Sequence, residues 1–196
     1  MKLAIIKYNA GNIQSVLFAL ERLGVEAEVT DDAEKIKSAD KVIFPGVGEA
    51  SSAMASLRES RLDEVIPSLT QPVLGICVGM QLLCSHSEEN NTTCLGVVPV
   101  DVKKFTSQQQ SLKVPQVGWN RIFQLRTPLF QGVPEQSYIY NVHSYYATDS
   151  DYTIALCSYG VNYAAAIRKN NFYGVQFHTE KSAETGDRII KNFLDL

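Results

Sequence analysis

The chain has 196 residues, of which 45% are hydrophobic and 20% charged, which is ordinary for a globular domain with a full core. A net charge of −3, without a Lys/Arg cluster, argues against nucleic acid and anionic membranes as partners. The N-terminal apolar run is cut by Lys7, so we expect no signal peptide, and no stretch approaches the ~20 apolar residues of a membrane span. The four cysteines form neither a C-x-x-C pair nor a metal-site spacing with histidine, so we expect no bound metal or cofactor. The absence of a signal peptide and of a disulfide framework favours a reducing cytoplasm.

The first half of the chain alternates apolar runs with amphipathic segments. A turn at residues 9–12 leads into the first helix, with Asn12 as its N-cap. We predict strands at residues 3–6, 25–29, 41–44 and 73–76, and helices at residues 16–23, 31–37 and 51–66, the last ended by Pro67. This alternation indicates βαβ units and a parallel sheet.

Beyond about residue 87 the sequence becomes richer in β-forming residues. Polar loops are expected at residues 87–93 and 106–111, and a C-terminal helix with Ile189, Ile190 and Phe193 on its inner face. Short strands are expected at residues 96–104, 121–125, 138–141, 152–158, 163–168 and 172–176. Their alternating character favours antiparallel or mixed pairing. The chain is therefore predicted to be an α/β protein with an additional small antiparallel or mixed β region.

One cysteine follows a buried strand directly and precedes a helix. Residues 72–83 read Pro-Val-Leu-Gly-Ile-Cys-Val-Gly-Met-Gln-Leu-Leu, which places Cys77 on the turn between the two elements. A side chain on such a turn stands exposed at the carboxyl edge of the sheet, where the helix N-terminus lowers a thiol pKa. Gly75 and Gly79 leave room for the strained turn. A buried free cysteine at a strand end is the alternative, and this stretch alone does not decide between the two.

A second candidate is the glycine-containing segment Pro45-Gly46-Val47-Gly48, which follows the third predicted strand. Two glycines around one residue at the carboxyl end of a parallel strand let the backbone approach a ligand and point its N–H groups toward it. An ordinary turn between a strand and a helix is the alternative.

A cysteine nucleophile needs a base and a group that orients the base. His86 is expected on the surface of the helix after Cys77, and His143 lies between two β runs. His178 ends a strand, and if the chain stays extended Glu180 projects on the same side and can orient the imidazole. A surface ion pair is the alternative. Together, the three segments favour acyl-transfer chemistry.

Two of these segments resemble class I (triad) glutamine amidotransferases: residues 75–81, Gly-Ile-Cys-Val-Gly-Met-Gln, and residues 174–180, Gly-Val-Gln-Phe-His-Thr-Glu. Within that superfamily the chain resembles the glutaminase subunits of imidazole glycerol phosphate synthases. This closer resemblance rests on Gly46-Val47-Gly48, Gly118-Trp119-Asn120 and Lys181-Ser182, with support from residues 9–12 and 142–146. It spans nearly the whole chain and implies one domain over residues 1–196, a flavodoxin-like three-layer sandwich.

The resemblance implies hydrolysis of glutamine to glutamate and ammonia through a cysteinyl thioester. Cys77 would be the nucleophile, His178 the acid and base, and Glu180 the residue that orients His178. The oxyanion hole would be formed by Val47, Gly48 and Val78. The amino-acid end of glutamine would be held by Gly46, Gln81, Glu89, His143, Ser144 and Tyr145.

The resemblance also implies a heterodimer in the cytoplasm. The partner would be a (β/α)8-barrel cyclase that receives the ammonia and makes imidazole glycerol phosphate and AICAR in histidine biosynthesis. Asn12, Trp119 and Lys181 match positions that face the cyclase. A core aromatic is the alternative for Trp119, and a solvated charge for Lys181.

The chain departs from the pattern at three places. Thr179 stands where proline is usual, which would leave Glu180 less rigidly held. Glu49-Ala50 and Gln116-Val117 also differ from the usual residues. These changes keep open a paralogous glutaminase that serves another synthase, such as a surface-sugar amination enzyme. A non-catalytic regulatory scaffold and a flavodoxin-like cysteine peptidase or chaperone are less favoured.

Overall fold

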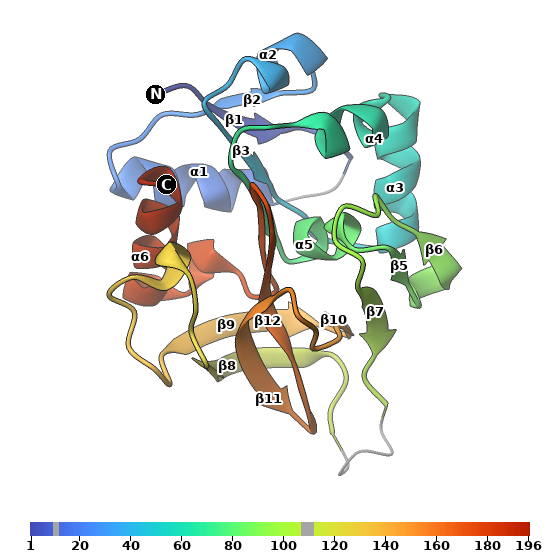
Figure 1. Ribbon diagram of the computed structural model, residues 1–196, viewed down its shortest axis with the longest axis vertical. Helices are drawn as coiled ribbons and strands as arrows, with labels where there is room; N and C mark the ends of the chain where they lie inside the picture. Colours follow the sequence, from blue (N-terminus) through green and yellow to red (C-terminus); the bar gives the residue numbers. More distant parts are fainter. Residues whose placement is uncertain (10–11, 107–111) are drawn as a thin grey trace.

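Five parallel strands form the centre of the sheet in the computed structural model, which describes residues 1–9, 12–106 and 112–196 (Figure 1). Their order is β2-β1-β3-β4-β13. The bounds are β1 Leu3–Ile6, β2 Glu28–Thr30, β3 Lys41–Phe44, β4 Val73–Ile76 and β13 Phe172–Val175. Every residue of β1, β3, β4 and β13 is buried, as expected for parallel strands covered on both faces.

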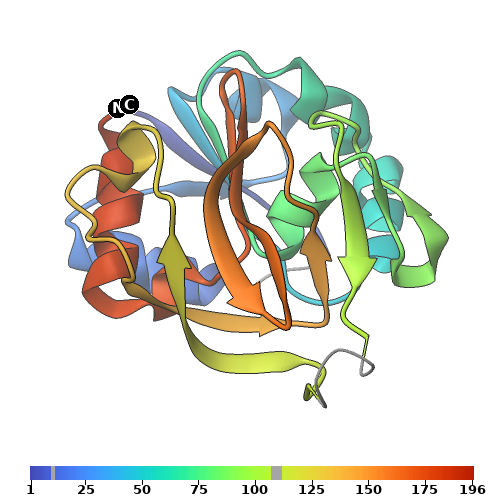
Figure 2. The ribbon, with the colours of Figure 1, turned by 60° about the horizontal axis from the view of Figure 1, so that its bottom comes forward.

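Helices cover both faces of this parallel part. Figures 1 and 2 show α1 and α6 together on one face, and α3 and α5 on the other. The helices are α1 Ile13–Arg22, α2 Ala33–Lys37, α3 Ala50–Glu59, α4 Leu62–Val65, α5 Val78–Leu83 and α6 Ala183–Leu194. Single 3-10 turns are η1 Ile66–Ser68, η2 Glu89–Asn91, η3 Pro128–Phe130 and η4 Thr179–Lys181. In the described ranges, no helix is both long enough and apolar enough to span a membrane.

The sheet continues from β13 into mostly antiparallel strands. β12 pairs with β13, β10 and β11, and β8 joins β11 to β9. The bounds are β5 His86–Ser87, β6 Thr92–Thr93, β7 Asp101–Lys104, β8 Gln116–Phe123, β9 Tyr138–His143, β10 Tyr145–Ala147, β11 Thr153–Tyr159 and β12 Val161–Lys169. The predicted α/β fold class, a parallel sheet between helices with an additional antiparallel or mixed region, is confirmed.

Several predicted elements differ from the structure. The helix expected over residues 51–66 is two helices, because Arg61 adopts a left-handed conformation (φ 59°) between α3 and α4. The helix after Cys77 ends at Leu83, so His86 lies in β5 and not on a helix. Only residues 101–104 of the strand expected at 96–104 form a strand. Ala10, Gly11 and residues 107–111, which belong to predicted loops, lie outside the described residues.

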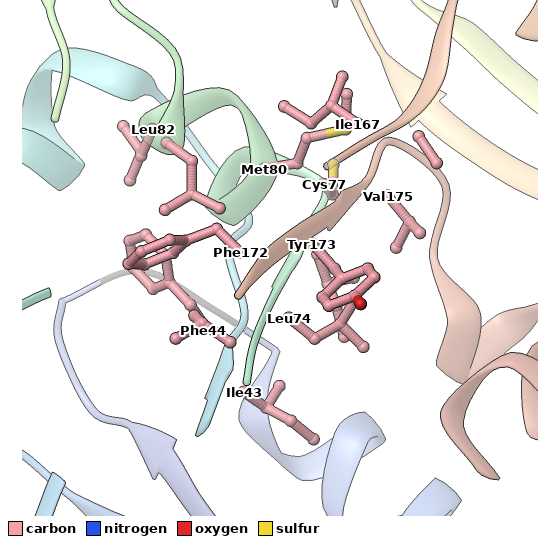
Figure 3. Close-up of a cluster of buried hydrophobic side chains, with 14 of the residues drawn as sticks. Ile43, Phe44, Leu74, Cys77, Met80, Leu82, Ile167, Phe172, Tyr173 and Val175 are labelled. Carbon is pink, nitrogen blue, oxygen red and sulfur yellow. The ribbon is translucent and has the colours of Figure 1, made fainter. Parts of the chain in front are cut away.

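The turn at Cys77 is packed so tightly that it requires the glycines around it. A Cβ on Gly79 would lie 1.9 Å from the carbonyl oxygen of Phe44, and one on Gly75 would lie 2.8 Å from the amide nitrogen of Met80. Figure 3 shows Cys77 beside Met80 and Val175, at the end of the apolar core. The predicted role of the two glycines, to allow close approach of strand and helix, is confirmed.

We therefore expect Gly79→Ala to destabilise the protein by about 3 kcal/mol or more, because the new methyl group overlaps backbone atoms that cannot move away alone. Urea unfolding measures this change. Glu59→Ala, on the exposed end of α3, is the control and should change the stability by less than about 0.5 kcal/mol. Equal stability of the two variants would contradict the packing argument.

Candidate active site

Cys77 lies between β4 and α5 in a strained backbone conformation, with φ 53° and ψ −110°. Its amide donates to the carbonyl of Val175 at 2.8 Å, and its carbonyl accepts from the amide of Gln81 at 3.2 Å. A non-glycine residue strained at a strand-to-helix turn is typical of a nucleophile. The prediction that the side chain is exposed is wrong, because Cys77 is only 3% exposed. Cys77 instead borders a cavity.

His178 and Glu180 form a buried pair. Nδ1 of His178 lies 2.7 Å from Oε1 of Glu180, and the two side chains are 5% and 2% exposed. The alternative of a surface ion pair is therefore wrong. The expected extended chain is also wrong, because a 3-10 turn begins at Thr179 and brings the Glu180 side chain to the imidazole.

The environment of His178 favours its protonated form. Burial lowers the pKa of this imidazole, but hydrogen bonds and charge interactions with Cys77 and Glu180 outweigh burial and raise the pKa to about 10. His178 is thus placed to hold a proton between a sulfur nucleophile and a carboxylate. This arrangement can move a proton to and from a reacting group.

Ser182 fixes the backbone around the buried pair. Its hydroxyl donates to the carbonyl of His178 at 2.6 Å and accepts from the amide of Tyr140 at 3.0 Å, while the amide of His178 donates to the carbonyl of Tyr140 at 2.9 Å. These bonds hold the turn although Thr179 occupies the usual proline position. They also join η4 to β9.

A cavity of about 310 Å³ opens beside these residues, a size suited to a small molecule. It is lined by Val47, Gly48, Cys77, Val78, Gln81, Glu89, Pro115, Val142, His143, Ser144, Tyr145, His178 and Lys181. The cavity thus unites most of the predicted site residues. Four of them do not line it: Gly46, Glu180, Asn12 and Trp119. Within the described ranges, no three His, Cys, Asp or Glu side chains are grouped to hold a metal ion.

The amide of Val78, a predicted oxyanion donor, already has an acceptor. It donates to the carbonyl oxygen of Gly46 at 3.3 Å. The segment is held nearby by the hydroxyl of Tyr8, which donates to the carbonyl of Pro45 at 2.6 Å. A Cβ on Gly46 would lie 2.5 Å from the amide nitrogen of Gly79, so only glycine fits here. In this conformation the Val78 amide does not point to an empty oxyanion position.

Three of the predicted substrate residues contact one another: the carbonyl oxygen of Tyr145 accepts hydrogen bonds from the side chains of His143 and Gln81. Its donors are Nδ1 of His143 at 2.7 Å and Nε2 of Gln81 at 2.9 Å. Burial lowers the pKa of His143 to about 4, so its imidazole is neutral with the proton on Nδ1. Nε2 of His143 lies 3.3 Å from the hydroxyl of Tyr163, which donates to Oε1 of Gln116 at 3.1 Å. Ser144, between these residues, lines the cavity.

Glu89 lies at the edge of the cavity in η2, where a loop was predicted. Its Oε2 accepts a hydrogen bond from the amide of Ala50 at 2.7 Å, at the first residue of α3. Burial raises the pKa of this carboxyl group, and the bond from Ala50 opposes the shift. Glu89 thus connects the cavity to the helix that follows the Gly46–Gly48 segment.

Gln176, which no sequence pattern pointed out, lies beside Cys77. Gln176 is fully buried, and its Nε2 lies 3.8 Å from Sγ of Cys77. It also accepts a hydrogen bond from Gln81 at 2.9 Å. Its position two residues before His178 could have identified it, because alternate residues of an extended segment project to the same side.

Trp119 is exposed on β8 together with other apolar residues. It is 53% exposed, so the alternative of a core aromatic is wrong. We call the outward side of the β8–β9 pair the β8–β9 face; its exposed apolar residues are Val117, Trp119, Tyr138 and Val142. Asn12 caps α1, and exposed Lys181 lies in η4, which contacts both α1 and β9.

Known proteins resemble the chain over its full length. Residues 4–196 match the family model described as glutamine amidotransferase class-I. The imidazole glycerol phosphate synthase subunit HisH of Bacteroides fragilis is 57% identical, and that of Bacteroides thetaiotaomicron 54%, each over 100% of both chains. The HisH subunit of Haemophilus influenzae is 47% identical over 100% of this chain and 98% of its own.

Solved structures share the fold at low sequence identity. A glutamine amidotransferase structure matches with a TM-score of 0.76 at 17% identity, covering 100% of this chain and 98% of its own. A glutamine amidotransferase from Thermotoga maritima matches with a TM-score of 0.65 at 17% identity, covering 100% of this chain and 83% of its own. With the full-length match to the family model and relatives up to 57% identical, the chain belongs to the class-I glutamine amidotransferases and, within them, to the HisH family.

Proposed function

We propose that this chain hydrolyses glutamine to glutamate and ammonia, and that the ammonia is used by a partner subunit to make imidazole glycerol phosphate and AICAR in histidine biosynthesis. The observation that supports the reaction is the strained Cys77 beside the buried His178–Glu180 pair at the cavity. The names of the full-length relatives support the pathway. We take residues 1–196 as one domain in the cytoplasm.

In the first step, the Cys77 sulfur attacks the side-chain amide carbon of glutamine, and a C–S bond forms. His178, which has taken the thiol proton, gives a proton to the amide nitrogen, the C–N bond breaks and ammonia leaves. In the second step, His178 takes a proton from water, whose oxygen attacks the thioester carbon. The C–S bond breaks, the sulfur regains the proton and glutamate leaves. Glu180 orients His178 throughout.

Glutamine would lie in the cavity with its amino-acid end away from Cys77. Both N–H groups of Gln81 are used by Tyr145 and Gln176, so Gln81 would offer its Oε1 to the substrate ammonium. The second oxygen of Glu89 would bind the same ammonium. Gly46 and the segment His143 to Tyr145, with Ser144, would complete the site.

The oxyanion hole would form only when the Gly46–Val47 peptide turns. The Gly46 carbonyl now accepts from Val78; after the turn Val78 would be free, and the amide of Val47 or Gly48 would become the second donor. We infer that glutamine turnover is low until the partner, loaded with its nucleotide, favours this change. Such control would prevent the waste of glutamine.

The proposed partner is a (β/α)8-barrel cyclase that forms a heterodimer with this chain. Ammonia becomes mostly ammonium in neutral water, so a docked acceptor is expected. The β8–β9 face, with Trp119, and the nearby Asn12 and Lys181 are the proposed contacts. A paralogue serving another synthase would need a different acceptor, and the names of the relatives favour the cyclase.

The test is glutamate release by the purified chain, alone and with a cyclase barrel and its nucleotide. We expect strong stimulation, and we expect Cys77→Ala to remove the activity while the unfolding midpoint stays close to that of the wild type. Glutamate release that survives in Cys77→Ala would exclude the mechanism. Equal rates with and without the partner would instead overturn the oxyanion proposal.

Removal of the Glu180 carboxylate should change the pH dependence of stability. Since the pKa of His178 is raised from 6.5 to about 10, its proton contributes stability that is full below pH 6.5 and is lost as the pH rises toward 10. In Glu180→Gln this loss should be smaller, because the neutral amide no longer attracts the imidazolium. Urea unfolding at several pH values measures it. Glu184→Gln, exposed on α6, is the matched control and should keep the wild-type slope.

Trp119→Ala should weaken binding of the cyclase subunit by about 2 kcal/mol or more, because a large exposed aromatic is lost from the proposed interface. Isothermal titration calorimetry with the cyclase measures this. Leu196→Ala removes another exposed apolar side chain, at the chain end away from β8 and β9 (Figure 2), and should bind like the wild type. Unchanged affinity for Trp119→Ala would argue against this face.

A further inference from the structure

Within the described residues, Gln176 is the one side chain besides His178 that is placed to donate a hydrogen bond to the sulfur of Cys77. The carbonyl of Val142 is placed to accept one from the same sulfur. Nε2 of Gln176 lies 3.8 Å from Sγ of Cys77, and the carbonyl oxygen of Val142 lies 3.9 Å from the same sulfur. A thiol can donate to Val142, whereas a thiolate can only accept, as it would from Gln176. The two contacts therefore favour opposite protonation states of Cys77.

The direction of the Gln176 amide follows from a main-chain carbonyl. The oxygen of Tyr145 can only accept, so the Gln81 atom that contacts it must be the amide nitrogen. The same nitrogen, with its second N–H, contacts Gln176 at 2.9 Å, so the Gln176 atom there must be the oxygen. The remaining atom of the Gln176 amide, which faces the sulfur, is therefore the nitrogen.

The burial of Gln176 gives this contact its strength. The side chain is fully buried, so water does not compete for the amide, and a hydrogen bond to a charged group is stronger there than one between neutral groups. His178 is the charged group that faces Cys77. Tyr8 and Tyr163 also act on Cys77, but burial raises the pKa of both hydroxyls, so they stay neutral in the working range.

We propose that Gln176 is a further catalytic residue, which donates a hydrogen bond to the Cys77 thiolate and so favours the charged form of the nucleophile. The inference rests on the proposed glutaminase function, and it adds a residue to that site. Gln81 lines the cavity and also donates a hydrogen bond to Gln176. The side-chain amide of Gln81 therefore links the cavity to the residue that contacts the Cys77 sulfur.

The test is the rate of Cys77 alkylation by iodoacetamide from pH 5 to pH 10, followed by intact mass with Cys77→Ala as the background. Gln176→Met keeps the length of the side chain but has no N–H. Gln176→Glu keeps an oxygen for Gln81 and places a second oxygen at the sulfur. For both we expect the midpoint of alkylation to move to higher pH. At pH 7 the rate should fall about tenfold, the lower end for a hydrogen bond to a charged group.

Gln71→Met is the matched control. Nε2 of Gln71 also donates to a carbonyl, that of Ile36 at 2.8 Å, but Gln71 precedes β4 at the end away from Cys77. This variant should keep the wild-type pH profile. Folded Gln176 variants that also keep the wild-type profile would overturn the proposal, whereas a merely structural role would lower their unfolding midpoint and leave the profile unmoved.

If neither Gln176→Met nor Gln176→Glu folds, an NMR measurement on the wild-type protein tests the proposal. The side-chain amide signals of Gln176 in a ¹H–¹⁵N spectrum should shift with the pH of thiolate formation, and the shift should vanish in Cys77→Ala. Amide signals that do not respond would overturn the proposal. Alkylation does not require glutamine turnover, so a wild type that alkylates normally but releases no glutamate with the cyclase would count against the proposed function alone.

Discussion

The close approach of α5 to the ends of β3 and β4 is the constraint on which the rest of the site depends. Gly79 contacts the Phe44 carbonyl so closely that no side chain fits, and Gly46 contacts Gly79 in the same way. Cys77, which directly precedes α5, has a positive φ of 53° at this point. The packing also brings the Gly46 carbonyl within reach of the Val78 amide. The same contact therefore fixes the turn at Cys77 and leaves the Val78 amide bonded to the Gly46 carbonyl.

Hydrogen bonds hold the residues that line the cavity, and their donors and acceptors follow from the Tyr145 carbonyl, which can only accept. The Tyr145 carbonyl accepts from His143 and Gln81, which leaves Gln81 with an oxygen for a ligand and Gln176 with a nitrogen for the sulfur. A buried polar group without a partner is costly, so each member of the network orients the next. The lining of the cavity and Cys77 are in this way connected by one hydrogen-bond network.

The arrangement described is consistent with a glutaminase that waits for its partner. The acid–base pair of His178 and Glu180 is already assembled at 2.7 Å, whereas the Val78 amide is still bound to Gly46. In the proposed mechanism, rotation of the Gly46–Val47 peptide would complete the oxyanion hole. The η4 turn contacts both α1 and β9 and carries Lys181 at the edge of the cavity, so a protein docked on the β8–β9 face would lie close to this segment.

Local features could be predicted from the amino-acid sequence, because their physical causes lie within a few residues. The strand–Cys77–helix turn, the glycines at 75 and 79 and the Asn12 cap follow from short-range spacing. The pairing of His178 with Glu180 was predicted from an extended chain, but a 3-10 turn makes it. The burial of Cys77, the exposure of Trp119, and the contacts of Val78 and Gln176 became visible only in the folded structure. Their causes are contacts between distant segments, such as the 99 residues that separate Cys77 from Gln176, and such contacts exist only once the sheet has formed.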